Sequence, residues 1–227
     1  MNAPGEVRAV VFDAYGTLFD WASASERSRD VLGDRWREFA ELWRQKQLQY
    51  TWLRSLMGRH ADFWKVTSEA LDFTLESFGI ADAALRPRLM GAYLQVAAYP
   101  DARHCLELLR AAGLSTAILS NGEPRMLEAA VESGGLRSLL DAVLSVEAAG
   151  TYKPHPSVYR LATERFGAEP GQLLFVSANG WDAWGAAAFG MQVAWCNRTG
   201  QRPERLPGGP AWTVRSLAEV PGVLGIG

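Results

Sequence analysis

The sequence predicts an α/β fold in which a doubly wound parallel sheet carries an inserted helical cap. Short apolar runs typical of strands occur at residues 7–12, 114–119, 142–144, 173–176 and 192–195. The stretches between the last four runs have helical patterns, and strands that alternate with helices form parallel sheets covered on both faces. About a hundred residues of helical pattern separate the first two runs, whereas a crossover needs only about a dozen. We therefore expect a core of residues 1–18 and 98–227 and a cap subdomain of residues 19–97.

The composition indicates a folded chain that binds a small ligand. With 227 residues, 48% of them hydrophobic, and 9 tryptophans, the chain can bury a full core. The 23 basic and 25 acidic residues are interspersed and give a net charge of −2, so the chain lacks the extended basic field that holds nucleic acid. We expect a small-molecule ligand and no nucleic-acid partner.

The sequence also predicts no membrane partner. Residues 1–6 lack the charged flank and apolar stretch of a signal peptide, and no segment approaches the ~20 apolar residues that span a bilayer. Cys105 and Cys196 lie among apolar residues without zinc or redox spacing, so both are expected to be reduced. These features predict a soluble cytoplasmic protein.

The first expected strand ends at a carboxylate. Asp13 follows residues 7–12 and precedes Gly16, so the strand delivers this carboxylate to the sheet edge where open α/β folds hold their ligands. Asp13 is therefore placed like a nucleophile. Phosphatases with a similar aspartate carry a second aspartate two positions later, which protonates an alkoxide leaving group, but here that position is Tyr15. A leaving group that departs as a stable anion, such as a halide, needs no such acid.

Within the expected cap, residues 34–57 have the apolar spacing of one helix face. We expect that face to pack inside the cap, and it consists of Trp36, Phe39, Ala40, Trp43, Tyr50, Leu53 and Met57. A second row, one turn apart, holds Arg44, Leu48 and Trp52 and could roof a small pocket. The alternative for this row is a surface arginine whose stem covers apolar neighbours.

Two further loops carry polar groups just after expected strands. Ser120 and Asn121 follow residues 114–119, where backbone amides and a hydroxyl can receive an anion, although both residue types are also common helix caps. Lys153 precedes an expected helix and could hold Asp13 ionised and attract a substrate carboxylate, because opposite charges stabilise the charged form. A solvated surface lysine is the alternative.

The fourth loop, residues 177–182, combines Asn179, Trp181 and Asp182 after a strand. Asp182 alone could cap the helix that follows. However, the carboxyl ends of parallel strands meet at one crevice, so the four loops together predict a single site. Residues 202–227, rich in Pro and Gly, are expected to form a loop and a short helix. A histidine-bound metal is not expected, because ligand spacing is lacking among His60, His104 and His155.

These segments resemble the haloacid dehalogenase superfamily, and within it the hydrolytic L-2-haloacid dehalogenases. The resemblance spans nearly the whole chain, in DAYGTL at 13–18, WRQKQL at 43–48, SNG at 120–122, YKP at 152–154 and SANGWD at 177–182. Phosphatases share the aspartate and lysine motifs. The discriminating residues are Tyr15, the segment around Arg44, and Asn179 with Trp181.

The resemblance implies a Rossmann-like core with a helical cap, in a homodimer that hydrolyses (S)-2-haloalkanoic acids to (R)-2-hydroxyalkanoic acids without a cofactor or metal. It implies that Asp13 displaces the halide and forms an ester, that Lys153 keeps Asp13 ionised, and that Asp182 activates water, a task that Asn179 could share. Tyr159 would support Lys153 or Asp182. The residues implied to orient the nucleophile are Thr17, Ser177 and Asn179.

For the substrate, the resemblance implies three sets of contacts. The substrate carboxylate would meet the Ser120 hydroxyl and the amides of Ala14, Tyr15 and Asn121. The leaving halide would meet Arg44 and Asn121, with Trp181 beside it. The pocket walls would be Tyr15, Gln45, Leu48, Phe63 and Trp181.

Two rival functions remain at the level of sequence. A magnesium-dependent small-molecule phosphatase of the same superfamily is favoured by the shared motifs but opposed by Tyr15 and Asn179, because Asn179 stands where a metal-binding acid is expected. A catalytically silent binding module is the second rival, and the intact Asp13 argues against it.

Overall fold

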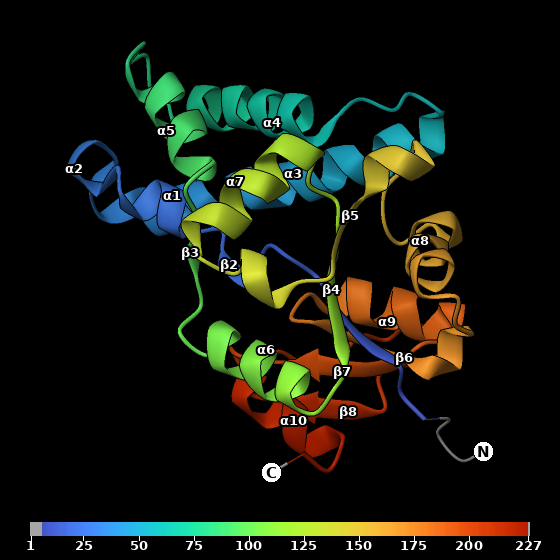
Figure 1. The fold of residues 1–227 in the computed structure, drawn as a ribbon. Coiled ribbons are helices and arrows are strands. Elements are labelled where there is room, and N and C mark those ends of the chain that lie inside the picture. Colours follow the sequence, from blue (N-terminus) through green and yellow to red (C-terminus); the bar gives the residue numbers. More distant parts are fainter. Residues whose placement is uncertain (1–5, 227) are drawn as a thin grey trace.

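The computed structural model describes residues 6–226 and confirms the predicted α/β class (Figure 1). Six parallel strands form the core sheet in the order β5-β4-β1-β6-β7-β8. Its strands are β1 (Ala9–Phe12), β4 (Ser115–Ser120), β5 (Ala142–Ser145), β6 (Leu173–Ser177), β7 (Gln192–Cys196) and β8 (Trp212–Val214). The first five residues of the expected core segment 1–18 lie outside the described residues.

Helices cover both faces of this sheet. After the cap, α6 (Ala102–Ala111) precedes β4 and α7 (Pro124–Ser133) leads from β4 to β5, so the chain moves away from β1 in one direction. It then returns in the other direction, with α8 (Pro156–Phe166) leading from β5 to β6 and α9 (Gly180–Phe189) from β6 to β7. Right-handed crossovers place these two pairs on opposite faces. The pair α8 and α9 pack together, and α6 packs against α10 (Val220–Val223). The central strands are buried on both faces and consist of apolar residues, as in other parallel sheets.

The cap consists of α1 (Ser23–Glu26), α2 (Arg29–Leu32), α3 (Trp36–Met57), α4 (Phe63–Ser77) and α5 (Leu85–Tyr93) (Figure 1). The Asp62 side chain caps α4 by accepting from the Lys65 amide at 2.8 Å. A two-stranded antiparallel ribbon, β2 (Phe19–Asp20) with β3 (Ala97–Ala98), joins cap to core. Because the chain leaves and re-enters the core at this ribbon, we propose it as the boundary of the two parts.

The buried face of α3 differs from the expected one in its second half. Trp36, Phe39, Ala40 and Trp43 are buried, as expected, but Leu53 is 44% exposed and Met57 62% exposed, so the prediction for those two is wrong, and Tyr50 is only partly buried. The buried positions there are instead Gln47 and Thr51.

Polar pairing explains this difference. The Gln47 amide donates to the Thr67 hydroxyl at 2.8 Å and accepts from the Tyr93 hydroxyl at 3.2 Å, while the Trp43 indole donates to the Thr67 carbonyl at 2.9 Å. Satisfied polar groups can be buried at little cost. Leu53 and Met57, which follow in α3, lie beside the face that carries Gln47 and Thr51 and remain exposed.

The carboxyl-terminal tail contains more structure than expected. The expected short helix is present as α10, but β8 adds an edge strand within a segment expected to be a loop. With only 3 residues, β8 gives too short a pattern for detection in a Pro- and Gly-rich stretch. No helix among residues 6–226 has the length and apolar character needed to cross a membrane.

Candidate active site

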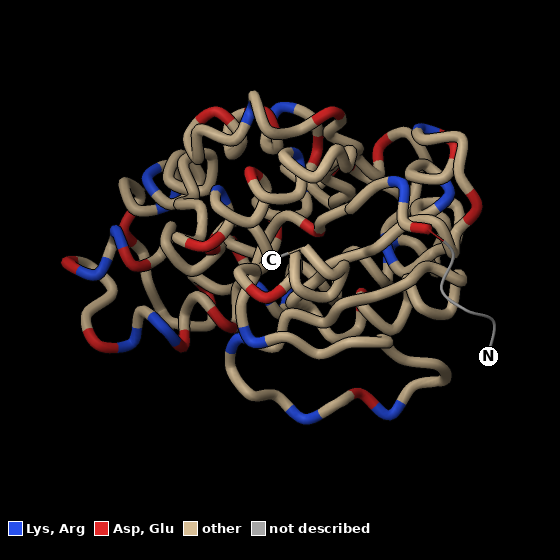
Figure 2. The backbone as a smooth tube through the Cα atoms, turned by 60° about the horizontal axis from the view of Figure 1, so that its bottom comes forward, with Lys and Arg blue, Asp and Glu red and all other residues tan. Residues whose placement is uncertain are grey.

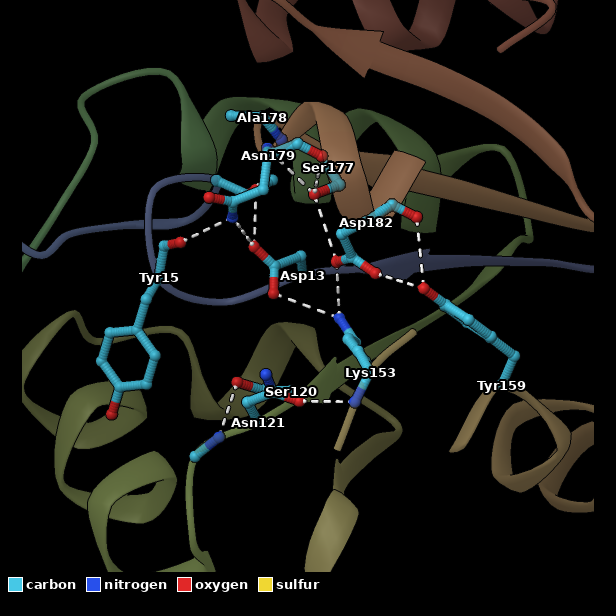
Figure 3. Close-up of polar contacts among 12 residues, drawn as sticks. Asp13, Tyr15, Ser120, Asn121, Lys153, Tyr159, Ser177, Ala178, Asn179 and Asp182 are labelled. Atoms are coloured by element: carbon cyan, nitrogen blue, oxygen red, sulfur yellow. Dashed lines mark hydrogen bonds and ion pairs between the residues drawn. The ribbon is translucent and has the colours of Figure 1, made fainter. Parts of the chain in front are cut away.

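The predicted loops meet at the carboxyl edge of the core sheet (Figure 3). Asp13 leaves β1 beside β6, and its backbone amide donates to the Val176 carbonyl at 2.9 Å. The same edge holds Ser120 at the end of β4 and Ser177 at the end of β6. Lys153 lies in the segment before α8. The topology therefore assembles residues far apart in the sequence.

Both carboxylate oxygens of Asp13 are held by donors. Oδ2 accepts from Asn179 Nδ2 at 2.7 Å and from Thr17 Oγ1 at 3.1 Å, and Oδ1 lies 3.2 Å from Lys153 Nζ. The Thr17 hydroxyl is fixed in turn, because it accepts from the Ala178 amide at 2.8 Å. Asp13 is only 5% exposed. A carboxylate held so closely has one orientation toward any reacting group.

Lys153 lies between two carboxylates. Its Nζ is 2.8 Å from Asp182 Oδ2 in addition to the contact with Asp13 (Figure 3). The same Nζ lies over the Phe175 ring, 4.8 Å from its centroid. Lys153 and Asp182 are completely buried. A buried charge is tolerated only when it is paired and hydrogen-bonded. Lys153 is therefore not the solvated lysine that the sequence left as an alternative.

Asp182 has two further partners. Its Oδ1 accepts from the Tyr159 hydroxyl at 2.8 Å, and its Oδ2 accepts from the Ser177 hydroxyl at 3.2 Å. The structure thus places Tyr159 against Asp182 rather than Lys153. Ser177, expected to orient Asp13, contacts Asp182 instead and also accepts from the Asn179 amide at 3.1 Å.

Sequence reasoning missed the role of Gly185 in this arrangement. A Cβ atom there would lie 2.6 Å from the Tyr159 hydroxyl and 2.6 Å from Pro154 Cβ. Only a glycine lets α9 approach closely enough for Tyr159 to reach Asp182. The sequence feature that could have indicated this role is a glycine, Gly185, in the interior of an expected helix.

Burial determines the protonation of two groups here. It raises the pKa of Asp182 to about 6, although the attraction of Lys153 acts in the opposite direction. It also raises the pKa of Tyr159 well above its ordinary value, so that the phenol stays protonated and remains a donor to Asp182. Asp182 can therefore exchange a proton near neutral pH, as a general base must.

Unpaired amides form an anion receptor beside Asp13. The backbone N–H groups of Ala14, Tyr15 and Asn121 have no acceptor among residues 6–226. Ser120 Oγ accepts from the Gly122 amide at 3.1 Å, and Asn121 Oδ1 accepts from the Lys153 amide at 3.1 Å, which fixes both side chains. Backbone amides without an acceptor in the protein are available to receive an anion such as a carboxylate.

Tyr15 contributes its backbone and its ring separately. Its carbonyl accepts from Asn179 Nδ2 at 3.0 Å and from Arg44 Nη2 at 3.4 Å, while the ring points away from Asp13 (Figure 3). That ring is buried against Phe63, with centroids 6.2 Å apart, and against Tyr93 at 5.4 Å. Burial holds the pKa of Tyr15 well above its ordinary value, so the phenol is a poor acid.

Of the residues expected from α3, the structure brings Arg44 and Leu48 to the site but not Gln45. Arg44 and Leu48 line a cavity together with Asn179, whereas Gln45 is exposed and is absent from the lining of this cavity. Arg44 Nε is buried without an acceptor among the described residues. Trp52, the last residue of the predicted row that begins at Arg44, packs edge-on against Trp181, with ring centroids 5.4 Å apart. Trp181 is one of the predicted wall residues.

The donor set at this site does not suit a divalent metal ion. Lys153 Nζ already pairs with both carboxylates, Asp13 and Asp182, and the neighbouring side chain is the amide of Asn179, which adds no charge for a metal. Among residues 6–226 no group of three or more His, Cys, Asp or Glu residues is arranged to hold a metal. A magnesium ion would have to displace the ammonium from both carboxylates.

The chain is similar to several known proteins. The family model of haloacid dehalogenase-like hydrolases matches residues 7–190. (S)-2-haloacid dehalogenase 1 of Pseudomonas sp. (strain CBS-3) is 46% identical over 219 residues, covering 96% of each chain. (S)-2-haloacid dehalogenase of Xanthobacter autotrophicus is 48% identical over 196 residues, covering 86% of this chain and 77% of the relative.

Similarity extends to solved structures. The structure of L-2-haloacid dehalogenase from Xanthobacter autotrophicus with chloropropionic acid covalently bound superimposes with a TM-score of 0.90 at 41% identity. The match covers 96% of this chain and 98% of that one.

Proposed function

The chain belongs to the haloacid dehalogenase-like hydrolases, and from this premise we propose that it hydrolyses (S)-2-haloalkanoic acids to (R)-2-hydroxyalkanoic acids and halide. The observation that carries the proposal is the surroundings of Asp13: a fixed carboxylate with an anion receptor beside it and no acid at the leaving-group position. An alkoxide leaving group needs that acid, whereas a halide departs unprotonated.

In the first step, the Asp13 carboxylate attacks C2 of the substrate, and the carbon–halogen bond breaks. The substrate carboxylate lies against the amides of Ala14, Tyr15 and Asn121 and the Ser120 hydroxyl. Attack from the side opposite the halide inverts C2. Holding the two reactants in line can contribute about 7–11 kcal/mol.

In the second step, water attacks the carbonyl carbon of the Asp13 ester. Asp182 accepts a proton from this water, while Asn179 and Lys153 stabilise the charge that develops on the Asp13 oxygens. Because this step breaks the bond between the carbonyl carbon and the ester oxygen, C2 keeps its inverted configuration. The product is therefore the (R)-hydroxy acid.

Halide release from a panel of 2-halo acids, assayed by enantiomer and with a chelator present, tests this function. We expect halide from the (S) acids, undiminished by chelator, and no release of phosphate from p-nitrophenyl phosphate. Phosphate release that requires magnesium, without halide release, would favour the phosphatase instead. Tyr15, where the phosphatases carry their second aspartate, and Asn179, where a metal-binding acid is expected, argue against that alternative.

Arg44→Lys should lower kcat by roughly 100-fold. The planar guanidinium of Arg44 donates to the Tyr15 carbonyl and leaves Nε free for the halide. Lysine keeps the charge but loses this geometry. Arg54→Lys is the matched control, since Arg54 lies on the same helix and pairs with Glu69 away from the site. Steady-state halide release from (S)-2-chloropropionate measures both variants. Equal turnover in the two would remove Arg44 from the halide site.

The pH dependence of kcat should report Asp182. With its pKa raised to about 6, this residue is protonated at lower pH and cannot accept a proton from water, so kcat should fall as pH drops through about 6. The Tyr159→Phe variant removes a hydrogen bond to the ionised carboxylate and should move this acidic limb to higher pH. An acidic limb at the same pH in both enzymes would assign the titration to another group.

We further propose that the protein is a cytoplasmic homodimer whose second copy covers an apolar patch on the cap. This patch consists of Leu53, Leu56, Met57 and Phe73, of which Leu56 is 84% exposed. Adjacent exposed apolar residues favour an interface. Both cysteines are buried and unpaired, as suits a reducing compartment. Light scattering should give twice the chain mass for the parent and the chain mass for Leu56→Glu, and a monomeric parent would contradict the dimer.

A further inference from the structure

The buried nucleophile requires a path to solvent. Asp13 is almost completely buried, and its partners Lys153 and Asp182 are fully buried. A cavity of about 350 Å³ lies where the cap meets the core, and Asn179, Arg44 and Gly16 are among the residues that line it. Since Asn179 donates directly to Asp13, this cavity reaches to within one side chain of the nucleophile.

One face of α3, over residues 36–48, lines the cavity. Arg37, Glu41, Arg44 and Leu48 follow each other at intervals of three or four residues, so they lie in one row on the helix. Arg44 is at the site, and the exposed Glu41 and Arg37 lie one and two turns nearer the amino terminus of α3. Neither exposed residue forms an ion pair within residues 6–226, so their charges act on the cavity mouth.

The opposite wall contains a fixed arginine. Arg198 binds Asp101 through both Nη atoms, at 2.7 and 3.0 Å, and the Thr17 carbonyl at 3.1 Å, and it lies over the Tyr99 ring. Its Nε is buried and has no acceptor among the described residues. Like Arg44 Nε, it is a buried cationic donor on a cavity-lining side chain, which is costly unless an acceptor visits it.

The aromatic and apolar residues of the remaining walls suit the carbon chain of an organic anion, while Asp20 adds a carboxylate whose Oδ1 accepts from the Ala22 amide at 2.9 Å. Trp21, Trp36 and Tyr99 present aromatic surface, and Leu48 lies at the inner end. Thr199, in the loop after β7, is exposed and lines the cavity. Arginine donors suit an anion rather than a cation, and aromatic walls suit a carbon chain, so the lining fits a short alkanoate.

We propose that this cavity is a transit site for 2-haloalkanoate anions, through which they reach Asp13 and in which Arg198 and Arg37 attract the carboxylate. This inference rests on the proposed function. A charge that acts on transit changes the association and dissociation rates together and leaves the dissociation constant nearly constant. A charge that acts on the final bound state changes the dissociation constant itself.

Stopped-flow tryptophan fluorescence tests the transit site, because the bromine of (S)-2-bromopropionate should quench the tryptophans along its path, Trp21 and Trp36 in the cavity and Trp181 at the site. With the Asp13→Asn enzyme, which holds the substrate unreacted, Arg37→Gln should slow association about twofold at low ionic strength, and Glu41→Gln should accelerate it by a similar factor. Both effects should disappear in high salt. Thr199→Phe, which narrows the cavity without adding a tryptophan, should slow association more for 2-bromohexanoate than for bromoacetate.

Matched controls lie on α8. Arg160 and Glu164 have the same spacing as Arg37 and Glu41, are exposed, and are absent from the cavity, so Arg160→Gln and Glu164→Gln change the net charge equally. The transit site would be overturned if the Arg37 and Glu41 variants had the association rates of these controls and Thr199→Phe had the rate of the parent. Halide release by the parent enzyme would then still support the function. Absence of halide release would overturn both.

Discussion

The Asp13→Asn enzyme should release no halide above the uncatalysed background, a loss on the order of 10⁴-fold or more. The amide has nearly the shape of the carboxylate, so contacts with Thr17 and Asn179 should still form and the fold should persist. The amide nitrogen and oxygen are far weaker nucleophiles. The measurement is steady-state halide release by ion chromatography.

Two controls make this result decisive. Intact mass must exclude deamidation of the introduced asparagine back to aspartate, and the unfolding transition must stay close to that of the parent. Turnover near the parent rate in a sample that passes both checks would mean that Asp13 is not the nucleophile.

Lys153→Met should reduce halide release by about 10³-fold or more, because the site loses the charge that stabilises both carboxylates. The protein should also lose stability, since removing one partner of a buried ion pair costs about 3–5 kcal/mol. Denaturant unfolding measures this second effect. Methionine keeps the length of the side chain, so the change is one of charge more than volume.

A double variant separates activity from stability. In Lys153→Met with Asp182→Asn, the second change removes a buried charge that has lost its partner, so part of the stability should return. Activity should stay lost, because both the ammonium and the base are missing. Recovery of activity along with stability would show that Lys153 supports the fold and not the chemistry.

Much of this site could be predicted from sequence because parallel strands end at one edge. Each of the five expected strands is present, and Asp13, Lys153 and Asp182 meet as the loops require. Charges of both signs are spread along the chain (Figure 2), as the composition suggested. An ionisable residue directly after an apolar strand is a local pattern that can be read from the sequence. The geometry of a parallel sheet then brings such residues together at one edge.

Other features depend on partners that a sequence pattern does not specify. The end of α3 carries apolar residues on its flank because Gln47 finds polar partners on α4 and α5. Ser177 contacts Asp182 and not Asp13, since one hydroxyl within a crowded loop can face either carboxylate. Gln45 is adjacent to Arg44 in sequence but points to solvent, because neighbours along a helix face different directions.

The transit site could not be predicted from the sequence, because its lining residues are dispersed along the chain. Its walls come from the cap, the ribbon segment and the loop after β7, which are far apart in the chain. Arg37 and Glu41 have the pattern of an ordinary exposed pair on a helix, and Arg198 that of a surface arginine. Only the folded arrangement reveals that they line one cavity that leads to Asn179.

A single turnover in heavy-oxygen water tests the covalent mechanism most directly. With enzyme in excess over an (S)-2-haloacid, water attacks the Asp13 ester, so the heavy oxygen should enter the Asp13 carboxylate. The product hydroxyl should then carry the ordinary oxygen that Asp13 held before the reaction. Peptide mass mapping of Asp13 and mass analysis of the hydroxy acid measure both. Label in the hydroxy acid and none in Asp13 would mean that water attacks the substrate directly, and would contradict the ester intermediate.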